Sequence, residues 1–216
     1  MARAVARLAP PVPRRPDMPP LRRSVLAADP IEQFRDWYER AEREVPLPHA
    51  MTLATVGGTG APDARMVLLK GFGSEAFTFF TNLRSAKAAQ LRDNPRAALV
   101  FYWRELDRQV RVRGPVELLA DADSDQYFAT RPRDSQIGAW ASPQSEPLAN
   151  RTELDSRAQE AAERFEGTSV PRPPFWGGYA LRPEEIEFWQ GQVARLHDRF
   201  RYTRAPVGWR LERLAP

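Results

Sequence analysis

The chain of 216 residues contains no cysteine, only two histidines and only two lysines, against thirty arginines. Without cysteine there can be no disulfide bond, thiolate nucleophile, iron–sulfur cluster or cysteine-ligated zinc. The two histidines, His49 and His197, are too few for a three-histidine metal site within one chain. We therefore expect a protein that holds no metal.

Long apolar runs are also missing. The longest, 97–103, has the length of a strand and falls far short of the ~18 residues that span a bilayer. No apolar segment typical of a secretory signal opens the sequence. We expect a cytoplasmic protein with no membrane partner.

Positive charge is concentrated at the start of the chain. Residues 1–23 hold six arginines, one aspartate and six prolines, so their net charge is +5, whereas the whole chain carries +4 and residues 24–216 carry −1. Proline at this density opposes folding, and we expect residues 1–28 to form a disordered leader before a single domain, 29–216. A transit peptide is the alternative, but proline disfavours its amphipathic helix. Because the body lacks a basic field, we expect no nucleic-acid partner.

The spacing of apolar residues predicts helices and strands. Asp29 and Pro30 form a helix start, and an apolar stripe predicts a helix to about Val45. Further helices are predicted at 85–93, 123–130 and 152–166. Short apolar segments predict strands at 51–56, 65–71, 76–81, 96–103, 109–119, 178–181, 186–190, 195–202 and 209–214. Trp140 and Trp176 fall outside these strands, in glycine-containing segments that we interpret as loops. The pattern predicts an α+β protein built on an antiparallel barrel.

One candidate site lies near the C-terminus. If 195–202 is a strand, Arg195, His197 and Arg199 share one face. Two guanidiniums beside an imidazole repel each other unless an anion lies between them, so this face predicts a phosphate- or carboxylate-binding wall. A solvated strand face in an arginine-rich protein explains the segment equally well.

A second candidate site lies around a helix end. Tyr127 and Arg131 are four residues apart, so a helix places both on one face. Pro132 ends that helix, and Ser135 is expected to open the next turn. A phenol, a guanidinium and a hydroxyl that meet at a helix boundary suit a phosphate monoester. The alternative is an ordinary helix end with a serine cap.

Cations flank two more segments. Arg65 and Lys70 bracket four apolar residues, and their odd spacing points them to opposite faces of a regular strand, so they serve two anions unless a bulge intervenes. A buried strand with charged tips is the alternative. Thr81, Ser85 and Lys87 lie where a strand runs into a helix N-terminus, which predicts a second phosphate cradle. Neither a Rossmann nor a P-loop motif is present.

Nine short stretches, in one order, carry a resemblance to a known family. They are Arg65-Met-Val-Leu-Leu-Lys70, Thr81-Asn82 with Ser85 and Lys87, Arg108-Gln109-Val110, Arg131-Pro-Arg-Asp-Ser-Gln-Ile-Gly-Ala-Trp140, Gln144-Ser145, Phe175-Trp-Gly-Gly178, Glu187-Phe-Trp-Gln-Gly191, Arg195-Leu-His-Asp-Arg199 and Arg213-Leu-Ala-Pro216. Together they resemble the pyridoxine/pyridoxamine 5′-phosphate oxidase family over about 29–216.

The resemblance implies a six-stranded split β-barrel with peripheral helices, and a homodimer with FMN at the interface. It implies oxidation of pyridoxine 5′-phosphate and pyridoxamine 5′-phosphate to pyridoxal 5′-phosphate by O2, giving H2O2 and, from the amine, ammonia. It assigns FMN to Arg65, Met66, Val67, Leu68, Leu69, Lys70, Phe80, Thr81, Lys87, Gln109, Gln144, Ser145, Trp189 and Arg199. It assigns the phosphorylated pyridine substrate to Lys70, Tyr127, Arg131, Ser135, Arg195 and His197, with the last two as catalytic residues.

Three features depart from the family pattern. Phe80 stands where tyrosine is common, and Ala86 stands where an arginine usually precedes the lysine. Loss of a charge-assisted hydrogen bond predicts FMN binding weaker by roughly one to two decades, unless Arg84 compensates. The loop 192–194 also differs from the usual form.

Two rival functions stay open. One is an oxidase on the same barrel that acts on another substrate, such as a phenazine-pathway oxidase. The set Tyr127, Arg131 and Ser135 favours a phosphorylated substrate over that rival. The other is a non-catalytic protein that binds flavin or pyridoxal phosphate, in which Arg195 and His197 would have no task.

Overall fold

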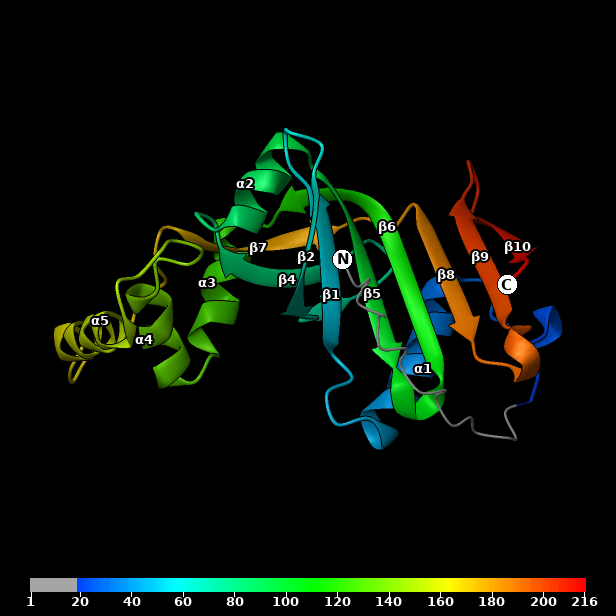
Figure 1. Ribbon diagram of the computed structural model, residues 1–216, viewed down its shortest axis with the longest axis horizontal. Coiled ribbons are helices and arrows are strands. Elements are labelled where there is room, and N and C mark those ends of the chain that lie inside the picture. Colours follow the sequence, from blue (N-terminus) through cyan, green and yellow to red (C-terminus); the bar gives the residue numbers. More distant parts are fainter. Residues whose placement is uncertain (1–18) are drawn as a thin grey trace, which may run out of the picture.

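The computed structural model describes residues 19–216 (Figure 1). The helices of this part are α1 Pro30–Glu44, α2 Ala86–Asp93, α3 Asp121–Ala129, α4 Arg133–Ala141 and α5 Arg151–Arg164. The strands are β1 Ala50–Val56, β2 Pro62–Leu68, β3 Gly71–Phe72, β4 Phe77–Asn82, β5 Arg96–Trp103, β6 Arg108–Leu118, β7 Trp176–Leu181, β8 Glu185–Gln190, β9 Asp198–Arg204 and β10 Trp209–Leu214. No described helix is long and apolar enough to cross a membrane.

Six of the strands curl into a barrel in the order β2-β1-β5-β6-β7-β4, and every neighbouring pair is antiparallel. The backbone N–H of Lys70 donates to the carbonyl of Thr78 at 2.8 Å and joins the two outer strands of this series. Strands β8, β9 and β10 extend the sheet beyond β6. The predicted α+β fold with an antiparallel split barrel is confirmed, and the described residues add four strands to the six predicted for the barrel.

Strand β6 belongs to both parts of the sheet because it changes partner near Gly114. Residues 108–113 pair with β8, whereas 116–118 pair with β7. A Cβ atom on Gly114 would lie 1.8 Å from the carbonyl oxygen of Arg182, which is impossible for any other residue without a backbone shift. Glycine at this position therefore lets the turn between β7 and β8 pack directly on the strand.

The main core fills the barrel under helix α1. This helix starts as predicted, with Pro30 in its first turn and the Asp29 carboxylate accepting a hydrogen bond from the N–H of Ile31 at 2.8 Å. Phe34 is fully buried, with ring centroids 4.8 to 5.1 Å from those of three other phenylalanines, Phe72, Phe77 and Phe101. A second, smaller core joins α3, α4 and α5 to the start of β7. These helices lie at the end of the molecule opposite β8–β10 (Figure 1).

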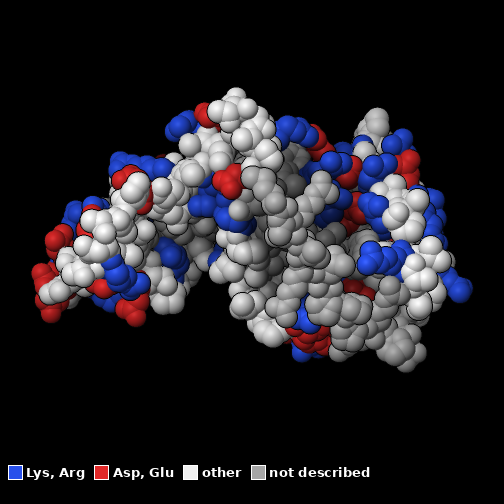
Figure 2. All heavy atoms as spheres, in the orientation of Figure 1, with Lys and Arg blue, Asp and Glu red and all other residues white. Residues whose placement is uncertain are grey.

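The β8–β10 end carries many arginines, and acidic side chains accompany them. Figure 2 shows blue and red atoms interspersed at this end of the molecule. Glu187 pairs with Arg111 at 3.2 Å and with Arg199 at 2.8 Å, and Arg201 pairs with Glu212 at 3.0 Å. The arginines of this sheet are therefore largely neutralised by cross-strand partners.

The segment before α1 packs against the same end of the sheet. Leu21 is buried and its N–H donates to the carboxylate of Asp198 at 2.9 Å. The side-chain amide of Gln190 donates to the carbonyl of Pro19 at 2.8 Å. The hydroxyl of Tyr202 donates to the carbonyl of Ala27 at 2.7 Å. Residues before 29 therefore pack against the sheet, although the sequence predicted that the domain begins at residue 29. Residues 1–18 of that leader lie outside the described residues.

Most predicted elements are present, and three local predictions are wrong. The predicted strand over 195–202 begins only at Asp198, because 193–195 form a 3-10 turn in which Ala194 and Arg195 have φ angles of 56° and 62°. Helix α4 was not predicted and contains Trp140, while Trp176 begins strand β7, so neither of these two tryptophans lies in a loop.

Candidate active site

A cleft of about 730 Å³ opens between the barrel and helices α3 and α4. Eleven of the predicted site residues line it: Met66, Val67, Leu68, Lys70, Phe80, Thr81, Lys87, Tyr127, Arg131, Ser135 and Gln144. Both lysines of the chain are among them. The prediction omitted Asn82, Thr130, Pro132, Gly138, Ala139, Ser142 and Trp176, which also line the cleft. Most of these contribute backbone or small side chains, which leave little signal in a sequence.

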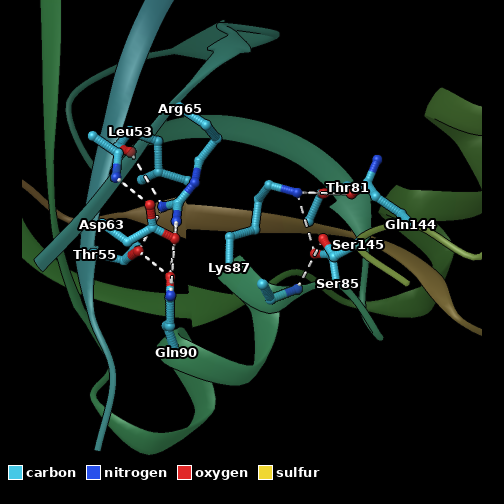
Figure 3. Close-up of polar contacts among 12 residues, drawn as sticks. Leu53, Thr55, Asp63, Arg65, Thr81, Ser85, Lys87, Gln90, Gln144 and Ser145 are labelled. Atoms are coloured by element: carbon cyan, nitrogen blue, oxygen red, sulfur yellow. Dashed lines mark hydrogen bonds and ion pairs between the residues drawn. The ribbon is translucent and has the colours of Figure 1, made fainter. Parts of the chain in front are cut away.

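One wall of the cleft is the junction of β4 with helix α2, where Lys87 is held by three acceptors (Figure 3). Its ammonium donates to the hydroxyls of Thr81 and Ser85, both at 3.2 Å, and to the side-chain oxygen of Gln144 at 2.7 Å. We call these four residues the Lys87 cradle. Since the first turn of a helix also presents free backbone N–H groups, the cradle is suited to an anion.

The pKa of Lys87 indicates that the cradle favours a bound anion. Burial of the ammonium and, second, the nearby Arg65 guanidinium lower the pKa of Lys87 to about 8, while Asp63 acts in the opposite direction. Two cations therefore lie near each other, and the carboxylate of Asp63 is paired with one of them, Arg65. An anion bound at the cradle would favour the charged form of Lys87.

This pKa predicts a pH dependence for the stability of the chain without a bound anion. Between pH ~8 and ~10.5 the unfolded chain binds the Lys87 proton and the folded chain does not, so stability rises with pH across this window. Because the side chain is partly exposed, we expect about 1 kcal/mol from this group. Urea unfolding at pH 7 to 10 should show this rise in the wild type, and Lys87→Met should lose it. An identical pH dependence in both proteins would contradict the assignment.

Arg65 lies beside the cradle and outside the cleft lining. Its guanidinium donates to the carbonyl of Leu53 at 3.3 Å and to the side-chain oxygen of Gln90 at 2.9 Å, and also to Thr55 and Asp63 (Figure 3). Strand β2 ends at Leu68, and Lys70 beyond it lines the cleft. Arg65 and Lys70 therefore reach two different places, but Lys70 lies beyond the strand, so the alternation of a regular strand is not the cause.

Another part of the cleft lining combines stacked aromatic rings with the half-buried guanidinium of Arg131. The ring of Phe80 stacks on those of Tyr127 and Trp176, at centroid distances of 4.2 and 5.3 Å. The guanidinium of Arg131 lies 4.7 Å from the Trp176 ring centroid, and its Nη1 is buried without any hydrogen-bond partner among the described residues. Burial lowers the pKa of Arg131. A buried N–H that lacks an acceptor predicts a missing ligand.

Lys70, Tyr127, Arg131 and Ser135 form what we call the phosphate set. The ammonium of Lys70 lies 5.8 Å from the Tyr127 ring centroid. Ser135 lies in the first turn of helix α4, and not in a turn before it as the sequence suggested. The set therefore joins two cations and two hydroxyls with the N-terminus of a nine-residue helix, an arrangement that suits a doubly charged oxyanion.

Three further predicted residues flank the cleft without lining it. The hydroxyl of Ser145 accepts a hydrogen bond from the N–H of Ala86 at 3.2 Å, which fastens its loop to the start of α2. Leu69 belongs to the barrel core. The guanidinium of Arg84 lies over the Phe175 ring at 4.7 Å and does not line the cleft, so its compensation for Ala86 stays a prediction.

The other five predicted residues lie on the β6–β8–β9 part of the sheet, and we call them the sheet-end set: Gln109, Trp189, Arg195, His197 and Arg199. None of them lines the cleft. Figure 1 shows β8 and β9 at the end of the molecule opposite α3 and α4. The single chain therefore does not bring the sheet-end set to the phosphate set.

His197 is oriented by its neighbours. Its ring packs on Trp189 with centroids 4.6 Å apart, and its Nδ1 accepts a hydrogen bond from the backbone N–H of Gln192 at 3.1 Å. The neutral imidazole therefore carries its proton on Nε2. Arg195, two residues earlier, is exposed on the strained turn. Arg195 and His197 are thus presented outward, but not as part of the strand face that the sequence predicted.

The chain matches two family models. Residues 38–165 match the model described as pyridoxamine 5′-phosphate oxidase, and residues 176–216 match the pyridoxine 5′-phosphate oxidase C-terminal dimerisation region.

Among curated proteins, the chain is 57% identical over 189 residues to a pyridoxine/pyridoxamine 5′-phosphate oxidase of Rubrobacter xylanophilus, covering 87% of each chain. It is 52% identical over 198 residues to the enzyme of the same name from Cupriavidus taiwanensis, covering 91% of this chain and 93% of that one.

Among solved structures, PhzG from Burkholderia lata, in complex with tetrahydrophenazine-1-carboxylic acid, is similar with a TM-score of 0.84 and 30% identity. The match covers 89% of this chain and 95% of PhzG. A pyridoxamine 5′-phosphate oxidase-related protein from Nostoc punctiforme shares the fold with a TM-score of 0.71, at 19% identity and over 88% of this chain and 100% of that one. The coverage and identity of the matches together show that the chain belongs to the pyridoxine/pyridoxamine 5′-phosphate oxidase family.

Proposed function

We propose that the chain is an FMN-dependent oxidase that converts pyridoxine 5′-phosphate and pyridoxamine 5′-phosphate to pyridoxal 5′-phosphate, in vitamin B6 biosynthesis or salvage. The alcohol and O2 would give the aldehyde and H2O2. The amine, O2 and water would give the aldehyde, ammonia and H2O2. The observation that carries the proposal is the buried, unpartnered N–H of Arg131 beside the rest of the phosphate set.

The phosphate set supports a phosphorylated substrate. A phosphate monoester carries about −1.5 to −2 charge at neutral pH and three acceptor oxygens. Lys70 and Arg131 supply two positive charges, and the hydroxyls of Tyr127 and Ser135 supply two further donors in the same cleft. Such a group would satisfy the free Nη1 of Arg131.

The Lys87 cradle supports FMN as the cofactor. Its half-buried ammonium, two hydroxyls and helix N-terminus suit the phosphate of FMN. When bound, FMN supplies the acceptor for the hydride that leaves the substrate carbon. In this proposal Lys87, Thr81 and Gln144 hold the cofactor, and the phosphate set holds the substrate against it. The two anion sites of the cleft thus have separate tasks.

A second copy of the chain completes the site in this proposal. Four members of the sheet-end set, Trp189, Arg195, His197 and Arg199, lie within the segment that matches the dimerisation region. In a homodimer with FMN at the interface, the outward-facing turn of one copy would reach the cleft of the other. Arg195 would then hold the substrate ring, and His197 would donate its Nε2 proton in a hydrogen bond to it.

The related PhzG structure supports a second candidate, oxidation of a tetrahydrophenazine carboxylic acid. The phosphate set argues against it, because a carboxylate carries only one negative charge and does not need two cations and two hydroxyls. The two functions are therefore separated by the charge of the preferred substrate.

The test is to purify the full chain, record its visible spectrum, and measure peroxide under air. We expect a flavin spectrum and peroxide with pyridoxine 5′-phosphate and pyridoxamine 5′-phosphate. We expect little peroxide with pyridoxine or with tetrahydrophenazine-1-carboxylic acid. A colourless protein that binds no FMN, or peroxide only with the phenazine compound, would overturn the proposal.

A further inference from the structure

The carboxylate of Asp63 lies close to the two cations at the cofactor cradle, Arg65 and Lys87. Asp63 is two residues before Arg65 on β2, and its side chain accepts hydrogen bonds from the Arg65 guanidinium and from the side-chain amide of Gln90, the latter at 3.0 Å. It also accepts from the N–H of Ala64 at 2.8 Å. The bond from Gln90 and the charge of Arg65 lower the pKa of Asp63. The carboxylate is therefore ionised at neutral pH.

Arg65 does not depend on Asp63 for its position. Three uncharged acceptors hold its guanidinium: the carbonyl of Leu53, the hydroxyl of Thr55 and the side-chain oxygen of Gln90. Gln90 is itself fixed, because the Thr55 hydroxyl donates to it at 2.6 Å. If the charge of Asp63 were removed, these bonds would still keep the guanidinium in place.

The pair of Asp63 and Arg65 lies next to the cradle. Lys87 and Gln90 are three residues apart on α2 and share one face of that helix. Gln90, which accepts a hydrogen bond from Arg65, is therefore one helical turn from Lys87. Figure 3 shows Arg65 and Lys87 on neighbouring sides of this helix, with Asp63 beyond Arg65. Both charges influence the Lys87 ammonium.

We propose that Asp63 is an internal competitor of the FMN phosphate, which holds the affinity for FMN below the value that Arg65 and Lys87 alone would give. This inference rests on the proposed FMN function. Two cations and one carboxylate leave a charge of +1 at the cradle, whereas the phosphate of FMN carries about −1.5 to −2. Asp63 reduces the attraction twice, because it occupies the guanidinium and repels the incoming dianion.

The test is FMN binding by Asp63→Asn, which keeps the shape of the side chain and removes its charge. The full chain, stripped of flavin, is titrated with FMN and with riboflavin, and the quenching of flavin fluorescence gives both dissociation constants. We expect Asp63→Asn to bind FMN about tenfold more tightly than the wild type and riboflavin equally well. The gain should shrink in high salt. A damaged fold cannot produce tighter binding.

Asp93→Asn is the matched control, because it removes the same charge from an exposed residue at the other end of α2. It should leave the FMN dissociation constant within about twofold of the wild type. If the wild type binds FMN and Asp63→Asn binds it no more tightly, or gains equally for riboflavin, the inference is overturned and the proposed function stands. If the wild type binds no FMN, both are overturned.

Discussion

Arg195→Ala is expected to lower kcat by about a thousandfold while the protein still binds FMN. Arg195 is exposed, lies outside the cleft, and sits on a turn in which two successive non-glycine residues have positive φ. Backbone strain of this kind persists where the surrounding structure imposes it, often at functional sites. Because Arg195 would meet the substrate only in the dimer, its loss should affect positioning and not folding.

Steady-state kinetics with pyridoxine 5′-phosphate, together with a flavin titration, measure this effect. The matched control is Arg210→Ala, which removes an exposed arginine from the neighbouring strand β10. It should keep kcat within about twofold, since surface substitutions of this kind change little. Near-normal turnover in Arg195→Ala would refute the role of this arginine.

Arg131→Met is expected to raise the KM for pyridoxine 5′-phosphate by about a hundredfold and to change kcat much less. The phosphate is remote from the carbon that loses hydride, so its contacts contribute equally to the ground state and the transition state. The same substitution should stabilise the ligand-free protein, because it replaces a half-buried guanidinium whose buried Nη1 lacks a partner among the described residues.

Kinetics and urea unfolding measure the two parts of this prediction separately. Arg164→Met is the control, because its guanidinium also lies over a tryptophan, Trp140, but outside the cleft. That variant should keep its KM. An unchanged KM in Arg131→Met, or an equal rise for unphosphorylated pyridoxine, would remove Arg131 from the phosphate set.

Three members of the phosphate set, Tyr127, Arg131 and Ser135, were predictable from local sequence, whereas Lys70 was assigned to the substrate only through the family resemblance. Tyr127 and Arg131 lie four residues apart around a helix end, and Pro132 marks that end clearly in the sequence. Lys87 was predictable for a similar reason, since a strand that runs into a helix places the first-turn side chains of that helix near the junction. The structure adds the bonds that hold Lys87: two acceptors, Thr81 and Ser85, are local, and the third, Gln144, comes from a loop 57 residues along the chain.

The secondary-structure predictions were wrong where the backbone conformation does not follow from the local sequence pattern. The strand predicted over 195–202 starts late because Ala194 and Arg195 adopt left-handed backbone angles, which glycine would have signalled and these residues do not. Gly138 made 137–140 read as a loop, although a glycine is tolerated in helix α4. The leader boundary depended on Leu21, whose N–H bonds to Asp198, 177 residues away. No local pattern reports such a contact.

Anaerobic mixing of the flavin-loaded protein with its substrate tests the central claim most directly. The claim is that a cleft built around the phosphate set positions a phosphorylated pyridine for hydride transfer. We predict that pyridoxine 5′-phosphate bleaches the flavin absorbance near 450 nm in a single turnover, and that air restores it. Equimolar pyridoxine should bleach it at least about a hundredfold more slowly. Equal bleaching by both compounds, or none by the phosphorylated one, would contradict the account.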